Sequence, residues 1–143
     1  RESIATVVDA GPDIIGHNVE TVARLYQIRS GADYQRSLAV LETVRELDPG
    51  LKTKSGIMVG LGETEAEVLQ VFADLRQAGC AYLSVGQYLA PSKSHYPVQA
   101  FIRPERFDFY REEALAMGFG HVESGPYVRS SYHAEQYKGG DEK

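Results

Sequence analysis

Cysteine is almost absent from this chain, because Cys80 is the only one in 143 residues. A single thiol excludes an internal disulfide framework and favours a reducing compartment: the cytoplasm, or a mitochondrion or plastid if the source is eukaryotic. It cannot hold an iron–sulfur cluster alone, because such a cluster takes several thiolate ligands. Its place between a predicted helix end and a predicted strand is typical of a small packed residue.

Long apolar runs and a secretory leader are missing too. No hydrophobic stretch is long enough to cross a bilayer. The net charge of −5, from 15 basic and 20 acidic residues, argues against non-specific binding to nucleic acid or to an anionic membrane. The sequence therefore predicts neither of these partners. Because the first residue is Arg1 rather than methionine, we expect the natural start of the protein to be missing.

Short apolar segments alternate with amphipathic ones, which predicts strands separated by helices. Strands are expected at residues 13–18, 54–61, 81–86 and 119–122. Helices are expected over 19–28, after an N-cap at Asp33, after a capping box of Thr64 and Glu67, and from Pro104 to near Gly118. The second of these helices has an apolar stripe, and the third should end at Gly79. The stripe comprises Leu38, Leu41, Val44 and Leu47.

This alternation predicts an α/β fold with parallel strands and right-handed crossovers. Four such strands make about half of a β/α barrel. Parallel sheets need both faces covered, and exposed edges are unfavourable, so a larger parent barrel is the first interpretation and a small doubly wound domain the second. We expect one domain over residues 1–137 and a disordered tail over 138–143.

Polar residues follow each predicted strand. In parallel β/α folds, functional groups collect at the carboxyl ends of the strands. One polar residue there is usually a cap, whereas four successive sets at one end favour a site. The sets are Asn18 with Glu20, the glycine-rich residues 60–63, Gln87 followed by His95, and residues 129–131.

Two of these sets are compatible with a nucleoside ligand. Glycines in residues 56–63 would let a flat ring approach the backbone, although a strand-to-helix turn explains them as well. Glu20 could accept ribose hydroxyls; alternatively, Asn18 caps the next helix and Glu20 favours its positive end. Lys54 and Ser55 could hold a carboxylate, or Lys54 could be a solvated cation. For the residues from Arg129 onward, the alternative to a site is a polar turn.

Taken together, these segments resemble lipoyl synthases. The similarity extends over about residues 12–134 in one order, and the combination of motifs is specific although each motif alone is not. The matching segments are HNVETV at 17–22, TKSGIMVGLGET at 53–64, GQYLAPS at 86–92 and SGPYVRSSYHA at 124–134.

The resemblance implies a partial (β/α)6 TIM-type barrel of the radical SAM type. The implied activity is the insertion of two sulfur atoms, at carbons 6 and 8, into a protein-bound octanoyl-lysine. The implied cofactors are S-adenosyl-L-methionine and two 4Fe-4S clusters. The implied partners are an octanoylated lipoyl carrier domain or glycine-cleavage H protein, and an electron donor such as ferredoxin or flavodoxin.

The resemblance also implies roles for individual residues. Ser131 would bind the auxiliary cluster, with Ser130 as the alternative ligand, and His95 and Arg129 would contact substrate. The implied cofactor-binding residues are Asn18, Glu20, Lys54, Ser55, Gly56, Met58, Gly60, Glu63 and Gln87.

The chain departs from the family in its cysteines. The two three-cysteine motifs that bind clusters in the family are absent from these 143 residues. We therefore expect the isolated chain, as the C-terminal half of such an enzyme, to be inactive. The alternative function is a non-catalytic half barrel that binds a carrier domain or complements another chain.

Overall fold

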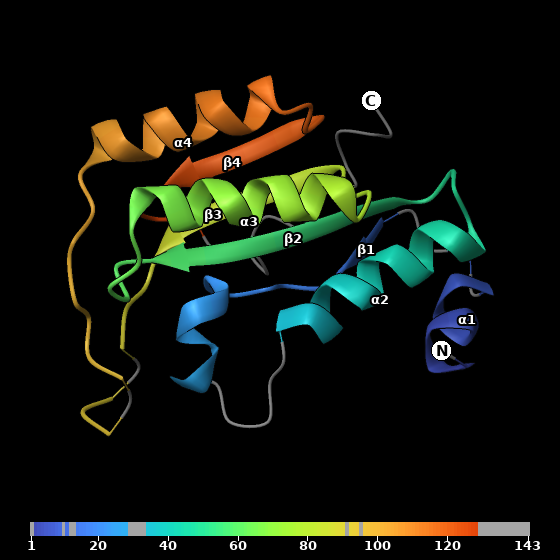
Figure 1. The fold of residues 1–143 in the computed structure, drawn as a ribbon, viewed down its shortest axis with the longest axis horizontal. Helices are drawn as coiled ribbons and strands as arrows, with labels where there is room; N and C mark the ends of the chain where they lie inside the picture. Colours follow the sequence, from blue (N-terminus) through green and yellow to red (C-terminus); the bar gives the residue numbers. More distant parts are fainter. Residues whose placement is uncertain are drawn as a thin grey trace.

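Four parallel strands form one sheet in the order β1-β2-β3-β4 (Figure 1). The computed structural model describes residues 2–9, 11, 14–28, 34–90, 92–94 and 96–128. Parallel neighbours need crossover connections, because a tight hairpin cannot join them. The predicted set of four parallel strands is therefore confirmed. The strands are β1 (Ile14–Gly16), β2 (Lys52–Val59), β3 (Tyr82–Gln87) and β4 (His121–Gly125).

The helices that connect the strands lie mainly on one side of the sheet. Figure 1 shows α2, α3 and α4 on this side, with α4 running beside β4. The helices are α1 (Glu2–Asp9), the 3-10 helix η1 (Ala23–Ile28), α2 (Tyr34–Leu47), α3 (Glu65–Gln77) and α4 (Pro104–Ala116). Within the described ranges, none of them is both long and apolar enough to cross a membrane.

The hydrophobic core lies between these helices and one face of the sheet. Strand alternation turns Ile57, Val59, Leu83 and Val85 toward this core, where all four are buried. The helices contribute Leu38, Leu41 and Val44 from α2, Val68, Val71, Phe72 and Leu75 from α3, and Phe107, Tyr110 and Ala114 from α4. The intervening strand positions include glycine and serine, so the opposite face of the sheet is left for other contacts.

The capping box of α3 forms as predicted. The hydroxyl of Thr64 accepts a hydrogen bond from the amide of Glu67 at 3.2 Å, and the Glu67 carboxylate accepts one from the amide of Thr64 at 2.8 Å. Gly79, one residue beyond the C-cap, has a φ of 88° and ends the helix. Pro104 stands in the first turn of α4, also as predicted.

Two helical predictions need correction. The helix expected over 19–28 is replaced by η1, which begins only at Ala23, because Glu20 pairs with Ile57 of β2 instead. Asn18 therefore does not cap a helix, and Glu20 is not in a first helical turn. Leu47 is 36% exposed, because it is the last residue of α2 and lies beyond the stripe that faces the core.

The other differences concern strand bounds and the ends of the chain. Strands β1 and β2 span Ile14–Gly16 and Lys52–Val59 rather than residues 13–18 and 54–61. The last strand begins at His121 rather than at residue 119, because Phe119 is buried in the core against Phe72 at a ring-centroid distance of 6.4 Å. Helix α1 had no counterpart among the predicted elements. The N-cap predicted at Asp33 and the predicted tail over 138–143 lie outside the described residues.

Candidate functional site

The chain makes a tight turn at Glu20, shortly after β1. The amide of Thr21 donates to the carbonyl oxygen of Val19 at 2.9 Å, which closes a three-residue γ-turn around Glu20. Glu20 has a φ of 76° and is the only non-glycine residue with positive φ among those that the structure describes. This is the rarer, more strained form of γ-turn. Backbone strain of this kind persists where neighbouring structure enforces it, and it concentrates at functional sites.

Two backbone hydrogen bonds to β2 hold this turn in place. The amide of Glu20 donates to the carbonyl oxygen of Gly56 at 2.9 Å, and the amide of Met58 donates to the carbonyl oxygen of Glu20 at 2.8 Å. They form an isolated parallel bridge between Glu20 and Ile57. The ladder between the two strands thus resumes beyond β1 and fixes Glu20 beside the second half of β2.

Glu20, β2 and β3 together surround a small cavity of about 60 Å³. The strand register places Gly56 beside Ser84 and Met58 beside Gly86, so these four residues share one face of the sheet. Ligand sites commonly have volumes of roughly 300–1,000 Å³, so the described residues form one wall of a site rather than a complete pocket. The lining residues are Glu20, Gly56, Ile57, Met58, Ser84, Gly86 and Val128.

Lys54 and Ser55 occupy opposite faces of β2. Lys54 shares the face of Gly56 and is only 5% exposed, and burial lowers the pKa of its ammonium group. The alternative that Lys54 is a solvated cation is therefore wrong. Ser55 is fully buried, and its hydroxyl accepts a hydrogen bond from the amide of Val19 at 3.2 Å. Ser55 thus supports the turn at Glu20 from behind.

Gln87 holds a loop and does not line the cavity. Its Nε2 donates to the carbonyl oxygens of Tyr88 at 3.0 Å and Ala100 at 2.9 Å, and its Oε1 accepts from the amide of Ile102 at 2.8 Å. Gly60 belongs to the same junction, because a Cβ there would meet Gln87 Nε2 and the carbonyl oxygen of Ala100. These contacts give both residues a structural role, and their contact with a cofactor stays a prediction.

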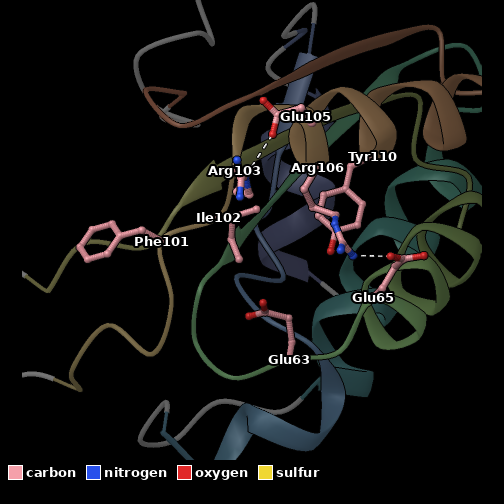
Figure 2. A pocket seen from close by; sticks show the side chains of 8 residues that line it. All are labelled: Glu63, Glu65, Phe101, Ile102, Arg103, Glu105, Arg106 and Tyr110. Carbon is pink, nitrogen blue, oxygen red and sulfur yellow. Dashed lines mark hydrogen bonds and ion pairs between the residues drawn. The ribbon is translucent and has the colours of Figure 1, made fainter.

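Glu63 lines a larger cavity of about 370 Å³ near the first turns of α3 and α4 (Figure 2). Its carboxylate accepts hydrogen bonds from the amides of Gly60, at 3.0 and 3.1 Å, and Leu61, at 2.9 Å, so it closes the loop after β2. Figure 2 shows the charges around it paired with each other, Arg106 with Glu65 and Arg103 with Glu105. The two cavities share no lining residue.

Several predicted site residues are not among those brought together. His95, Arg129 and Ser131 lie outside the described residues. Asn18 is described and partly buried, but it does not line the small cavity. The glycine and methionine of the predicted motif, Gly56 and Met58, do line it beside Glu20.

Four residues that line the small cavity were not among the predicted site residues: Ile57, Ser84, Gly86 and Val128. Ser84 could have been found, because strand alternation puts it on the face of Gly86. Val128 could not, since its place depends on how the chain turns after β4. The buried hydroxyl of Thr21, next to the strained turn, has no hydrogen-bond partner within the described part of the chain. Such orphaned groups are rare and point to a partner supplied from elsewhere.

The sequence profile of the Radical SAM superfamily matches residues 1–85, more than half of the chain. The chain belongs to the radical SAM superfamily. The matched region includes Glu20, Gly56 and Met58, which line the small cavity. The four-stranded parallel sheet is accordingly part of a TIM-type barrel of the radical SAM type, as predicted.

Within the radical SAM superfamily, the chain is similar to several lipoyl synthases. That of Geobacter metallireducens is 73% identical over 139 residues, 97% of this chain and 49% of the relative. That of Geotalea uraniireducens is 73% identical over 135 residues, with coverages of 94% and 48%. That of Alkaliphilus metalliredigens is 56% identical over 137 residues, with coverages of 95% and 47%. The resemblance to lipoyl synthase is confirmed, and the chain spans about half the length of these relatives.

Membership of the radical SAM superfamily implies S-adenosylmethionine and iron–sulfur chemistry. The small cavity fits part of a nucleoside, because Glu20 supplies a carboxylate and Gly56 carries no side chain that would obstruct a flat ring. No cluster site is formed within the described ranges, where no group of three or more His, Cys, Asp or Glu side chains could hold a metal ion.

Proposed function

We propose that these residues act as the C-terminal half of a lipoyl synthase, which inserts two sulfur atoms into a protein-bound octanoyl-lysine at carbons 6 and 8. The single observation that carries the proposal is the convergence of a strained Glu20 with Gly56 and Met58 on one cavity. The identity of 73% to lipoyl synthases over nearly the whole chain supports the same activity.

In this proposal, Glu20 accepts hydrogen bonds from the ribose hydroxyls of S-adenosylmethionine. Gly56 leaves room for the adenine ring beside Met58, and Lys54, on the same face of β2, would bind a carboxylate of the ligand. When bound, S-adenosylmethionine together with an iron–sulfur cluster would supply the radical that abstracts hydrogen from the octanoyl chain. The described residues bind and orient the nucleoside and keep water from the backbone around it.

Ser131 is the proposed protein ligand of an auxiliary 4Fe-4S cluster, with Arg129 two residues before it in the sequence. A serine binds iron as an alkoxide, a harder ligand than thiolate, and we expect it to dissociate more readily. That property suits a cluster that gives up its sulfur. The other ligands of two such clusters would have to come from cysteines outside these 143 residues, so the isolated chain should be inactive.

The proposed substrate is an octanoylated lipoyl carrier domain or glycine-cleavage H protein, contacted by His95 and Arg129. The proposed reductant is a ferredoxin or flavodoxin. Both follow from the similarity to lipoyl synthases. Residues 1–137 are proposed to form the C-terminal part of the barrel domain.

The test is a pair of variants in the full-length protein with reconstituted clusters, Ser131→Ala and Ser130→Ala. The assay measures 5′-deoxyadenosine and lipoyl product from an octanoylated carrier domain. We expect Ser131→Ala to keep measurable cleavage of S-adenosylmethionine and to lose sulfur insertion, and Ser130→Ala to retain both.

Two outcomes would contradict different parts of the proposal. Full lipoyl product from Ser131→Ala would overturn the ligand assignment. Absence of lipoyl product from the reconstituted wild-type protein, with a carrier domain that a known lipoyl synthase accepts, would overturn the function itself.

A further inference from the structure

The chain after β4 is in direct contact with Gly86 of β3. A Cβ built on Gly86 would collide with the carbonyl oxygen of Val128 and would lie 3.3 Å from its carbonyl carbon. Both atoms belong to the backbone, so they cannot swing aside as a flexible side chain would. Gly86 lacks the positive φ that would call for glycine on conformational grounds. The absence of a side chain at this position is therefore explained by the close approach of Val128.

Val128 is held over the sheet by a tight turn. Its amide donates to the carbonyl oxygen of Gly125 at 3.2 Å, so the chain reverses after the end of β4. Gly125 is the register partner of Gly86, and a Cβ there would lie 3.7 Å from Val128 Cγ2, an ordinary contact. Both glycines therefore lie next to Val128, but only at Gly86 would a side chain collide with its backbone.

This contact joins two parts of the proposed site. Val128 lines the small cavity together with Glu20 and Gly56, and it is also the residue directly before Arg129. Its carbonyl group is the last backbone group before the proposed cluster-ligand segment. The position of Val128 therefore affects the wall of the cavity. It also affects the point from which residues 129–131 continue.

We propose that Gly86 is a positioning residue, which seats the backbone of Val128 on β3 and thereby aligns the proposed S-adenosylmethionine site with the Ser131 segment. The part of this inference that concerns catalysis rests on the proposed function. The seating of Val128 itself does not depend on that function, so the two can be tested separately.

The seating is tested in the full-length protein by hydrogen exchange at the amide of Val128, comparing Gly86→Ala with Gly125→Ala. The first substitution forces the backbone of Val128 away, whereas the second adds a methyl group at ordinary contact distance. Loss of a hydrogen bond of average strength should accelerate exchange roughly fivefold to tenfold in Gly86→Ala. We expect little change in Gly125→Ala. Equal exchange in the two variants would overturn the inference.

The catalytic consequence is tested by the ratio of 5′-deoxyadenosine formed to lipoyl product formed. A displacement of about 1 Å at a reacting site can lower a rate roughly a hundredfold, so Gly86→Ala should lose lipoyl product on that scale. If Gly86 positions the Ser131 segment, the ratio of 5′-deoxyadenosine to lipoyl product should rise in Gly86→Ala, because cleavage of S-adenosylmethionine becomes uncoupled from sulfur insertion. Mere destabilisation would lower both quantities together. An unchanged ratio in Gly86→Ala would therefore contradict the positioning role.

A second variant covers the case in which Gly86→Ala does not fold. Val128→Pro leaves β3 untouched and removes the amide that donates to Gly125. We expect the same rise in the ratio, with Gly125→Ala again as the control. A wild-type ratio in Val128→Pro would also contradict the inference. Failure of the wild-type protein to make lipoyl product would instead count against the proposed function, while the exchange experiment would still decide the seating of Val128.

Discussion

Glu20 and Ile57 pair backbone to backbone in an isolated parallel bridge that lies beyond the end of β1. The bridge forces Glu20 to a φ of 76°, which for a residue with a side chain costs roughly 1–2 kcal/mol. A fold has no structural need to place a glutamate there, because glycine adopts this conformation without strain. The side chain that is retained at this cost lines the small cavity.

The first prediction separates strain from function at this position. Glu20→Gly should leave the free energy of unfolding of the full-length protein unchanged, or raise it by up to about 1 kcal/mol, because the strain is relieved. Glu20→Gln should leave stability unchanged. Both should weaken binding of S-adenosylmethionine roughly tenfold to a hundredfold, since hydrogen bonds to a charged group contribute about 1.5–3 kcal/mol. Denaturant unfolding and equilibrium dialysis measure the two quantities.

Opposite results would count against this interpretation. If Glu20→Gly strongly destabilised the protein and both variants bound S-adenosylmethionine as the wild type does, Glu20 would have a structural role only.

The fold was predictable where local chemistry decides it. Thr64 and Glu67 form a cap with each other, three residues apart, so the start of α3 follows from the sequence alone. The turn at Glu20 was not predictable, because it depends on Gly56 and Met58 of a strand more than thirty residues away. Without that bridge, the spacing after Asn18 favours a helix.

The same distinction explains the mixed outcome for the site. Glu20 could be proposed from its position after a strand, and Gly56 and Met58 from the glycine motif of the next strand; the three do meet at one cavity. Gln87 was predicted by the same reasoning, but its side-chain amide forms hydrogen bonds with the backbone of Ala100 and Ile102. These two residues come close to Gln87 only in the folded chain. A strand-end position therefore indicates where a side chain lies, and the neighbouring loops decide what it binds.

The second prediction concerns the ion pair of Arg24 with Glu67. Arg24 Nε lies 2.7 Å from one carboxylate oxygen of Glu67 and Nη2 lies 2.9 Å from the other, in the two-pronged geometry favoured by guanidinium groups. The hydrogen bond from Arg24, followed by that from the backbone of Thr64, lowers the pKa of Glu67 to about 2. Because the pKa is lower in the folded state, the stabilisation is fully present above pH 4.5, the ordinary value, and is lost as the pH falls toward 2.

Glu67→Gln should therefore flatten the decline of unfolding free energy between pH 4.5 and pH 2, as measured by denaturant titration at several pH values in this range. It should also lower stability near neutral pH. Glu112→Gln, at an exposed position on α4, is the matched control and should keep the wild-type slope. A wild-type slope in Glu67→Gln would show that the ion pair does not couple folding to protonation.

The third prediction concerns the amide of Gln87. Gln87→Leu leaves the carbonyl oxygen of Ala100 and the amide of Ile102 without their partners near a buried junction. Both hydrogen bonds are part-buried, and each contributes about 0.5–1.5 kcal/mol, so the unfolding free energy should fall by roughly 1–3 kcal/mol. Gln99→Leu, in which the lost hydrogen bond is exposed, should have a much smaller effect. Equal losses from the two variants would mean that the buried amide of Gln87 is not what anchors this loop.

The fourth prediction concerns the reactivity of Cys80. Its side chain is fully buried, and burial raises the pKa of the thiol to about 12. The thiol also donates a hydrogen bond to the carbonyl oxygen of Tyr82, with an Sγ–O distance of 3.2 Å. The thiolate is the reactive form, so in the folded protein at pH 8 Cys80 should react with iodoacetamide roughly a thousandfold more slowly than a free cysteine. Peptide mass spectrometry after a short exposure measures this rate. In urea the rate should rise to that of an unfolded peptide, whereas rapid labelling under native conditions would mean that the junction of α3 and β3 opens readily.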